Sequence, residues 1–142
     1  MKKVNILIVI LAIALVAVSC ETYDDYNTER KTVVGFTVAT KNINGVPEGG
    51  TKSTTVDVFV SDLSSADRTY TVISQPVDSL GTAAENYTFD STVTFPANTR
   101  TAIIEVVAVD NSITEERSYF KLAIQGGEDV VSGGVVEVGI RN

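Results

Sequence analysis

The sequence predicts an all-β domain over residues 32–142, built as a sandwich of two antiparallel sheets with about seven strands. Three observations favour this fold class. Apolar and polar residues alternate with period two in several segments, which is the pattern of half-buried strands. Gly, Pro and Asn cluster between those segments, as they do in turns. No segment predicts a crossover helix, which a parallel sheet would need, so successive strands are expected to run antiparallel.

The first 19 residues predict an export signal that precedes the domain. Lys2 and Lys3 come before the apolar run from Ile6 to Val18, and small residues follow that run before Cys20. A basic start, a short apolar segment and small residues at a cleavage site are typical of a secretory signal. The run is shorter than the roughly 20 residues that a membrane-spanning helix needs, so a transmembrane anchor is the weaker interpretation.

The stretch from Ala17 to Cys20 resembles the lipobox of bacterial lipoproteins, although Ala17 stands where Leu is commonest. In that family the cysteine thiol carries a diacylglycerol and the freed amine carries a further acyl chain. The resemblance therefore implies lipidation at Cys20 and membrane lipid as a partner, and more than one acyl chain makes attachment stable. Cys20 is the single cysteine. With Cys20 lipidated, the domain has no thiol for disulfides, nucleophilic catalysis or metal ligation.

Residues 20–31 form a polar segment without apolar periodicity and predict an exposed tether. Its acidic start, with Glu21, Asp24 and Asp25, resembles the short export signal of surface lipoproteins in Bacteroidota-type bacteria. An ordinary solubilising linker is the alternative. We therefore expect an outer-membrane lipoprotein that faces the periplasm or the cell surface, with the surface favoured.

The first predicted strands come directly after the tether. Thr32 to Ala39 is rich in Val, Thr and Phe and predicts a strand, whereas residues 41–50 hold the Asn, Gly and Pro of a loop. Ser53 to Ser61 predicts the next strand, because its valines share one face: Val56, Val58 and Val60. The following strands are predicted at Arg68 to Gln75, Thr92 to Phe95 and Thr101 to Val109. The last of these shows the clearest alternation, with Ile104, Val106 and Ala108 on one face.

Ser118 to Ile124 allows two interpretations. Ser112 and Glu115 have the spacing of a helix capping box. The segment is short, however, and its apolar residues Phe120, Leu122 and Ile124 alternate with period two, which favours a strand. Val135 to Ile140 predicts the final strand.

The composition excludes several classes of function. The chain has 11 Lys and Arg against 18 Asp and Glu, and without Lys2 and Lys3 the remaining 9 basic residues leave a net charge near −9. Basic residues are scattered, so a nucleic-acid partner is not expected. The chain has no His, which excludes Ser/His/Asp triads and zinc sites that depend on imidazole.

Five short motifs in order resemble the Calx-β domains, which are immunoglobulin-like sandwiches found in sodium–calcium exchangers and many bacterial surface proteins. The resemblance covers Val46 to Ile140 and implies the immunoglobulin-like form of the sandwich. The stretch Tyr87 to Ile124 also resembles N-terminal β domains of Bacteroidota lipoproteins. The five motifs are VPEGG (46–50), GTAAENYT (81–88), STVTFPANT (91–99), VDN (109–111) and ITEERSYF (113–120).

The Calx-β resemblance implies a calcium site that this sequence only partly retains. Glu48, Asp110 and Glu115 match acidic positions of the family. Calcium needs six to eight oxygen ligands and several carboxylates. Other acidic positions of the family are replaced here, by Asn86, Asn111, Ser118 and Arg141. Tight calcium binding is therefore not expected, and no other cofactor is predicted.

Two further groups of residues could serve a ligand. Tyrosines can stack on sugars, and the chain has Tyr23, Tyr26, Tyr70, Tyr87 and Tyr119, of which Tyr87 is also a candidate for a packed corner tyrosine. Glu115 and Glu116 are adjacent, so they are not expected to cooperate as a glycosidase pair.

The sequence predicts a non-catalytic, lipid-anchored envelope module for binding, adhesion or structure, with another envelope protein or a glycan as partner. One alternative is an accessory lipoprotein of an outer-membrane glycan-uptake complex. The other is a weak calcium-binding domain of the Calx-β type.

Overall fold

The computed structural model describes residues 30–142, of which Lys31–Asn142 form one compact unit. The predicted export signal, Cys20, Tyr23, Tyr26 and the tether up to residue 29 lie outside the described residues. Within them, no helix is long and apolar enough to cross a membrane.

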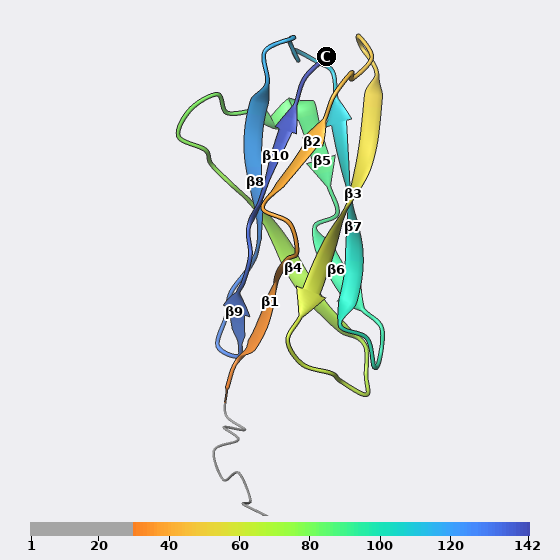
Figure 1. Cartoon of the computed structure of the whole chain (residues 1–142), viewed down its shortest axis with the longest axis vertical. Helices are drawn as coiled ribbons and strands as arrows, with labels where there is room; N and C mark the ends of the chain where they lie inside the picture. Colours follow the sequence, from red (N-terminus) through yellow and green to blue (C-terminus); the bar gives the residue numbers. More distant parts are fainter. Residues whose placement is uncertain (1–29) are drawn as a thin grey trace, which may run out of the picture. The chain divides into compact units, whose positions relative to one another are not determined.

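Two five-stranded sheets make up the domain (Figure 1). The strands of the first sheet are β1 (Thr32–Phe36), β3 (Thr51–Val60), β5 (Tyr87–Phe89), β7 (Thr101–Val109) and β9 (Val130–Ser132), in the order β5-β7-β3-β1-β9. Those of the second sheet are β2 (Thr40–Ile43), β4 (Arg68–Gln75), β6 (Thr92–Phe95), β8 (Ser118–Ile124) and β10 (Val136–Ile140), in the order β2-β10-β8-β4-β6. A short 3-10 turn, Ala84–Asn86, precedes β5. The predicted all-β sandwich is confirmed.

The hydrophobic core lies between the sheets, and the predicted alternation places the right residues there. Val56, Val58 and Val60 of β3 are buried, whereas Asp57 and Phe59 face outward. The alternating sets of β7, β8 and β10 are buried in the same way, including Ile104, Leu122 and Val138. Full burial of a side chain of this size contributes about 1.5–3 kcal/mol, so these periodic faces are the main stabilising feature of the fold.

The first predicted strand is wrong in one respect, because Thr32 to Ala39 is not one strand. β1 ends at Phe36, the chain crosses between sheets at residues 37–39, and β2 then continues in the second sheet. β1 pairs with β9 in parallel, and β2 pairs with β10 in parallel. The sandwich is therefore not fully antiparallel. The prediction missed the crossing because residues 37–39, which are Thr, Val and Ala, continue the β-rich composition of β1.

Ten strands are present where about seven were predicted. Besides β2, the additional strands are β5 and β9, and each of these has only three residues, too few to show a period. The predicted strand at Ser118 to Ile124 is confirmed as β8. The capping-box spacing of Ser112 and Glu115 lies in a loop of bends between β7 and β8, and Glu116 lies there too, exposed and not on a strand.

Candidate functional site

The three predicted metal ligands lie around one hollow at the end of the sandwich, which we call the end depression. Glu48 and Gly49 line it from the loop between β2 and β3, and Asp110 and Glu115 line it from the loop between β7 and β8, together with Asn111, Ser112, Ile113 and Asn142. The motif alignment therefore placed Glu48, Asp110 and Glu115 at the same hollow. Within residues 30–142, however, no three His, Cys, Asp or Glu side chains converge as a group that could hold a metal ion.

The Asp110 carboxylate is engaged with the backbone of both loops. The Gly49 N–H donates to its Oδ2 at 2.9 Å, and the Ile113 N–H donates to its Oδ1 at 2.9 Å. The Asp110 N–H in turn donates to the Gly50 carbonyl at 2.8 Å. Because one carboxylate oxygen serves each loop, Asp110 fastens the two loops together.

Asn86 also holds loop backbone in place at this end of the sandwich. It is the one buried polar side chain among the described residues. Its Oδ1 accepts from the N–H groups of Asn111, at 3.1 Å, and Ser112, at 3.0 Å. Its Nδ2 donates to Ser112 Oγ at 2.9 Å. An amide supplies both an acceptor and a donor here, so Asn86 satisfies the turn after β7 without placing a charge inside the protein.

The other positions that depart from the Calx-β pattern also have partners within the protein. The Asn111 Nδ2 donates to the Glu85 carbonyl, and the Thr82 hydroxyl donates to Ser118 Oγ at 2.9 Å. Arg141 Nε donates to Asn44 Oδ1 at 3.3 Å. These residues organise the loops at the end depression.

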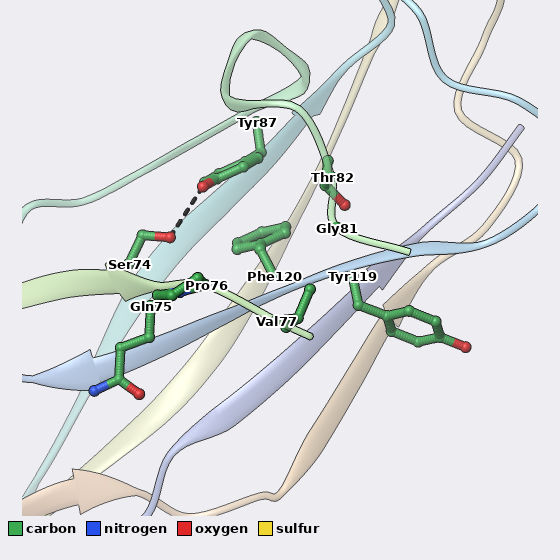
Figure 2. Close-up of a pocket in the computed structure, with 9 residues that line it drawn as sticks. All are labelled: Ser74, Gln75, Pro76, Val77, Gly81, Thr82, Tyr87, Tyr119 and Phe120. Carbon is green, nitrogen blue, oxygen red and sulfur yellow. Dashed lines mark hydrogen bonds between the residues drawn. The ribbon is translucent and has the colours of Figure 1, made fainter. Parts of the chain in front are cut away.

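A second hollow, the side depression, lies where the chain passes from β4 to β5 (Figure 2). Its volume is about 290 Å³. It is lined by Ser74 and Gln75 at the end of β4, by Pro76, Val77, Gly81 and Thr82 of the connection, by Tyr87, and by Tyr119 and Phe120 of β8.

An aromatic stack forms the inner wall of the side depression. The rings of Tyr87 and Phe120 are stacked, with centroids 3.8 Å apart and planes 9° apart. Tyr87 comes from the first sheet and Phe120 from the second, so the stack joins the two sheets. The Tyr87 hydroxyl lies 2.9 Å from Ser74 Oγ, as the dashed line in Figure 2 shows. Tyr87 is thus a packed tyrosine whose polar end reaches the hollow.

The connection that bounds the side depression is held against β8 in a strained conformation. Leu80 has φ 54°, in the left-handed region that a Leu side chain rarely adopts. The Tyr119 N–H donates to the Leu80 carbonyl at 2.8 Å, and the Thr82 N–H donates to the Tyr119 carbonyl at 2.8 Å. Strain of this kind persists where surrounding contacts enforce it and is often found at functional sites.

Sequence reasoning named Tyr87 and Tyr119 but could not assemble the side depression. Pro76, Val77, Gly81 and Thr82 of its lining belong to an irregular connection, which backbone hydrogen bonds hold against Tyr119. Tyr70 was named as well, and it packs edge-on against Phe95, with ring centroids 5.8 Å apart, away from this hollow. The lining contains no carboxylate, amine or guanidinium. Its polar groups are neutral hydroxyls and amides, which suit hydrogen bonding to a ligand.

No protein-family model matches this chain, and no curated protein matches it in sequence.

Solved structures do resemble the fold. A candidate carbohydrate-binding protein from Bacteroides ovatus matches with a TM-score of 0.61 and 10% identity, over 77% of this chain and 36% of that one. The apo form of the Calx CBD1 domain matches with a TM-score of 0.59 and 12% identity, over 79% of this chain and 97% of that one. The Calx CBD12 structure matches with a TM-score of 0.57 and 13% identity, over 77% and 44%. The chain thus spans about a third of the first structure and nearly all of the second, and its fold is that of a Calx-β-like sandwich.

Proposed function

We propose that the protein is a non-catalytic saccharide-binding module, held at the cell envelope by lipid on Cys20 and facing the cell surface. The observation that carries the proposal is the side depression. It offers an aromatic wall together with neutral donors and acceptors at Ser74, Gln75 and Thr82. A sugar presents C–H groups and hydroxyls together, so a wall with both apolar and hydrogen-bonding parts is complementary to it.

The size and the walls of the hollow support the same proposal. A volume of about 290 Å³ lies at the small end of ligand pockets, which suits one ring of a chain or a chain end. The candidate carbohydrate-binding role of the Bacteroides ovatus structure adds support, since that protein contains this fold as roughly a third of its length.

Binding of soluble polysaccharides to the purified full chain in detergent tests the proposal, with affinity electrophoresis as the measurement. Gly81→Phe is the blocking variant, because a Cβ at Gly81 lies 3.4 Å from Val77 Cγ2 and a larger side chain is directed at the lining. Gly127→Phe is the matched control, since nothing lies within 4 Å of a Cβ there. We expect retarded migration that Gly81→Phe removes and Gly127→Phe preserves. Unretarded migration of the wild-type chain on every polysaccharide contradicts the proposal.

A role as accessory lipoprotein in a glycan-uptake complex is a second proposal, favoured by one observation. The matched Bacteroides ovatus and Calx CBD12 chains each contain more than this fold, so the fold also occurs as one module among others. Affinity purification from detergent-solubilised membranes tests it. Recovery of a transporter together with the chain supports the accessory role, and recovery of the chain alone contradicts it.

A further inference from the structure

The outer face of the second sheet gathers positive charge at one corner. β2 and β10 run in parallel register with Asn42 opposite Gly139, and β8 and β10 run antiparallel with Tyr119 opposite Gly139. Directly beyond the ends of these ladders, Arg117 and Arg141 both meet the side chain of Asn44. Three neighbouring strands, which lie side by side in Figure 1, thus bring together residues 44, 117 and 141.

Both guanidinium groups depend on one neutral acceptor. Arg117 Nη2 donates to Asn44 Oδ1 at 2.7 Å, and Arg141 Nε donates to the same oxygen at 3.3 Å. Because they share one acceptor, Arg117 Nη2 and Arg141 Nε lie no farther apart than the sum of these two distances, so the two guanidinium groups are neighbours. Arg117 Nε is buried and has no acceptor among the described residues. A guanidinium carries five N–H donors, so most of the donors of this pair are not used by side chains of the described part of the chain.

Among residues 30–142, no carboxylate is recorded in an ion pair with Arg117 or Arg141. The chain has more acidic than basic residues, and Glu115 and Glu116 lie directly before Arg117 in the sequence. Nevertheless, the one ion pair recorded on this face within residues 30–142 joins Lys121 and Glu137, at 3.8 Å. Two like charges held together without a counter-charge favour an anion as the missing partner.

Lys52 adds to the positive charge behind the arginine pair. Its Nζ donates to the Asn44 carbonyl at 2.7 Å, so three basic side chains meet at one asparagine.

The side chains of Arg117 and Tyr119 pack together over Gly139 beside the arginine pair. A Cβ at Gly139 would lie 2.6 Å from Asn42 Oδ1, 2.8 Å from Arg117 Cδ and 3.1 Å from Tyr119 Cε1, so these three side chains close over the bare glycine. Figure 2 shows the Tyr119 ring directed away from Tyr87 and Phe120. Tyr119 therefore lines the side depression and also presents its ring beside the arginine pair.

We infer that this corner binds the carboxylate or sulfate group of an acidic saccharide. The inference rests on the proposed saccharide-binding function and names the class of sugar. Arg117 and Arg141 hold the anion, Asn42 and Asn44 orient it, and Tyr119 packs against the sugar ring. Guanidinium groups match carboxylates and sulfates in charge and geometry, and an aromatic ring beside them favours a sugar over a bare ion.

Calorimetry with the full chain in detergent tests the inference, with polygalacturonate and its fully methyl-esterified form as a charged and neutral pair. We expect the charged polymer to bind more tightly, and its binding to weaken as salt is raised. Arg141→Gln and Arg117→Gln should each weaken binding about tenfold or more, as expected for loss of a charge-assisted pair. Lys121→Gln is the matched control, because it removes one positive charge from the same face and should leave binding unchanged.

Several outcomes would overturn the inference. Equal binding of the two polymers, unaffected by Arg141→Gln, overturns it and leaves the proposed saccharide-binding function standing. Binding of poly-glutamate as tight as that of polygalacturonate assigns the corner to an acidic protein and so overturns the sugar assignment.

A direct probe of the corner does not depend on saccharide binding. Inorganic sulfate and free galacturonate should each shift the Nε–H resonances of Arg117 and Arg141 in NMR spectra, and no shift with either anion overturns the inference. If thermal melting shows that Arg117→Gln does not fold, the exposed Arg141 decides the test alone.

Discussion

Single polar side chains fix the loops at the end depression, and each acts on backbone N–H groups. Asp110 accepts one from each of two loops, and Asn86 accepts two from the turn after β7. A buried N–H without an acceptor costs about 1–3 kcal/mol. Loops without regular strands need such acceptors to keep one conformation.

Asn86→Ala should therefore lower the free energy of unfolding by about 2–4 kcal/mol, because two N–H groups lose their acceptor. Urea unfolding measures it. Asn42→Ala is the control, since Asn42 is exposed and should change stability by less than about 0.5 kcal/mol. Equal stability of the two variants would contradict the structural role assigned to Asn86.

Asp110→Ala should lower the free energy of unfolding by about 1–2 kcal/mol, with the same loss in calcium and in chelator, because its hydrogen bonds join loops of the protein itself. Thermal unfolding with and without chelator measures this. A stabilisation of the wild-type domain by calcium that the variant lacks would show instead that the carboxylate serves an ion.

At the scale of the strands, the crossing from β1 to β2 depends on close approach of two backbones. The segment that follows β9 runs beside the end of β1. The Gly133 N–H donates to the Val34 carbonyl, and the Phe36 N–H donates to the Gly134 carbonyl, each at 2.8 Å. A Cβ at Gly35 would lie 2.3 Å from Gly134 N. Only a residue without a side chain fits between these two crossing segments.

Gly35→Ala should lower the free energy of unfolding by about 2–3 kcal/mol, because the atoms it meets are backbone and cannot turn aside. Gly127→Ala is the matched control, with no atom within 4 Å of the added Cβ, and should change stability by less than about 0.5 kcal/mol. Urea unfolding of both variants distinguishes them, and equal stability would contradict the close approach.

The sequence predicted best the strands that are long enough to show the two-residue alternation of buried and exposed side chains. β3 and β7 run for ten and nine residues, and every buried position alternates. β5 and β9 have three residues each, and their pairing partners alone define them. β2 was assigned to a loop because Asn42 and Asn44 signal a turn, whereas its ladder with β10 makes it a strand.

The candidate sites were predictable to different degrees for a related reason. Glu48, Asp110 and Glu115 were identified through motifs that resemble a known family, and all three line one hollow, where the described residues form no group that could hold a metal ion. The arginine pair could not be predicted, because residues 44, 117 and 141 meet only through the registers of β2, β8 and β10. A sequence without those registers shows only scattered basic residues.

At the scale of the whole molecule, the proposed lipid on Cys20 makes the attachment of the protein to the membrane testable. Cys20→Ala removes the thiol that would carry the acyl chains and should release the protein from the membrane fraction or leave its signal uncleaved. Fractionation and the mass of the mature chain measure it, and Cys20→Ser is a closely matched second variant. Processed protein retained in the membrane would show that another feature anchors it.

The two parallel strand pairs, β1 with β9 and β2 with β10, also determine when this chain can fold. β1 and β2 lie at the start of the domain, whereas their partners β9 and β10 lie at its end. A chain that is synthesised from its N-terminus presents β2 long before β10, so the second sheet cannot be completed until β10 is available. Pairings this distant in sequence fold slowly. The arginine pair needs Arg141, which follows β10, so the corner proposed to bind acidic sugars is assembled only once β10 has paired with β2 and β8.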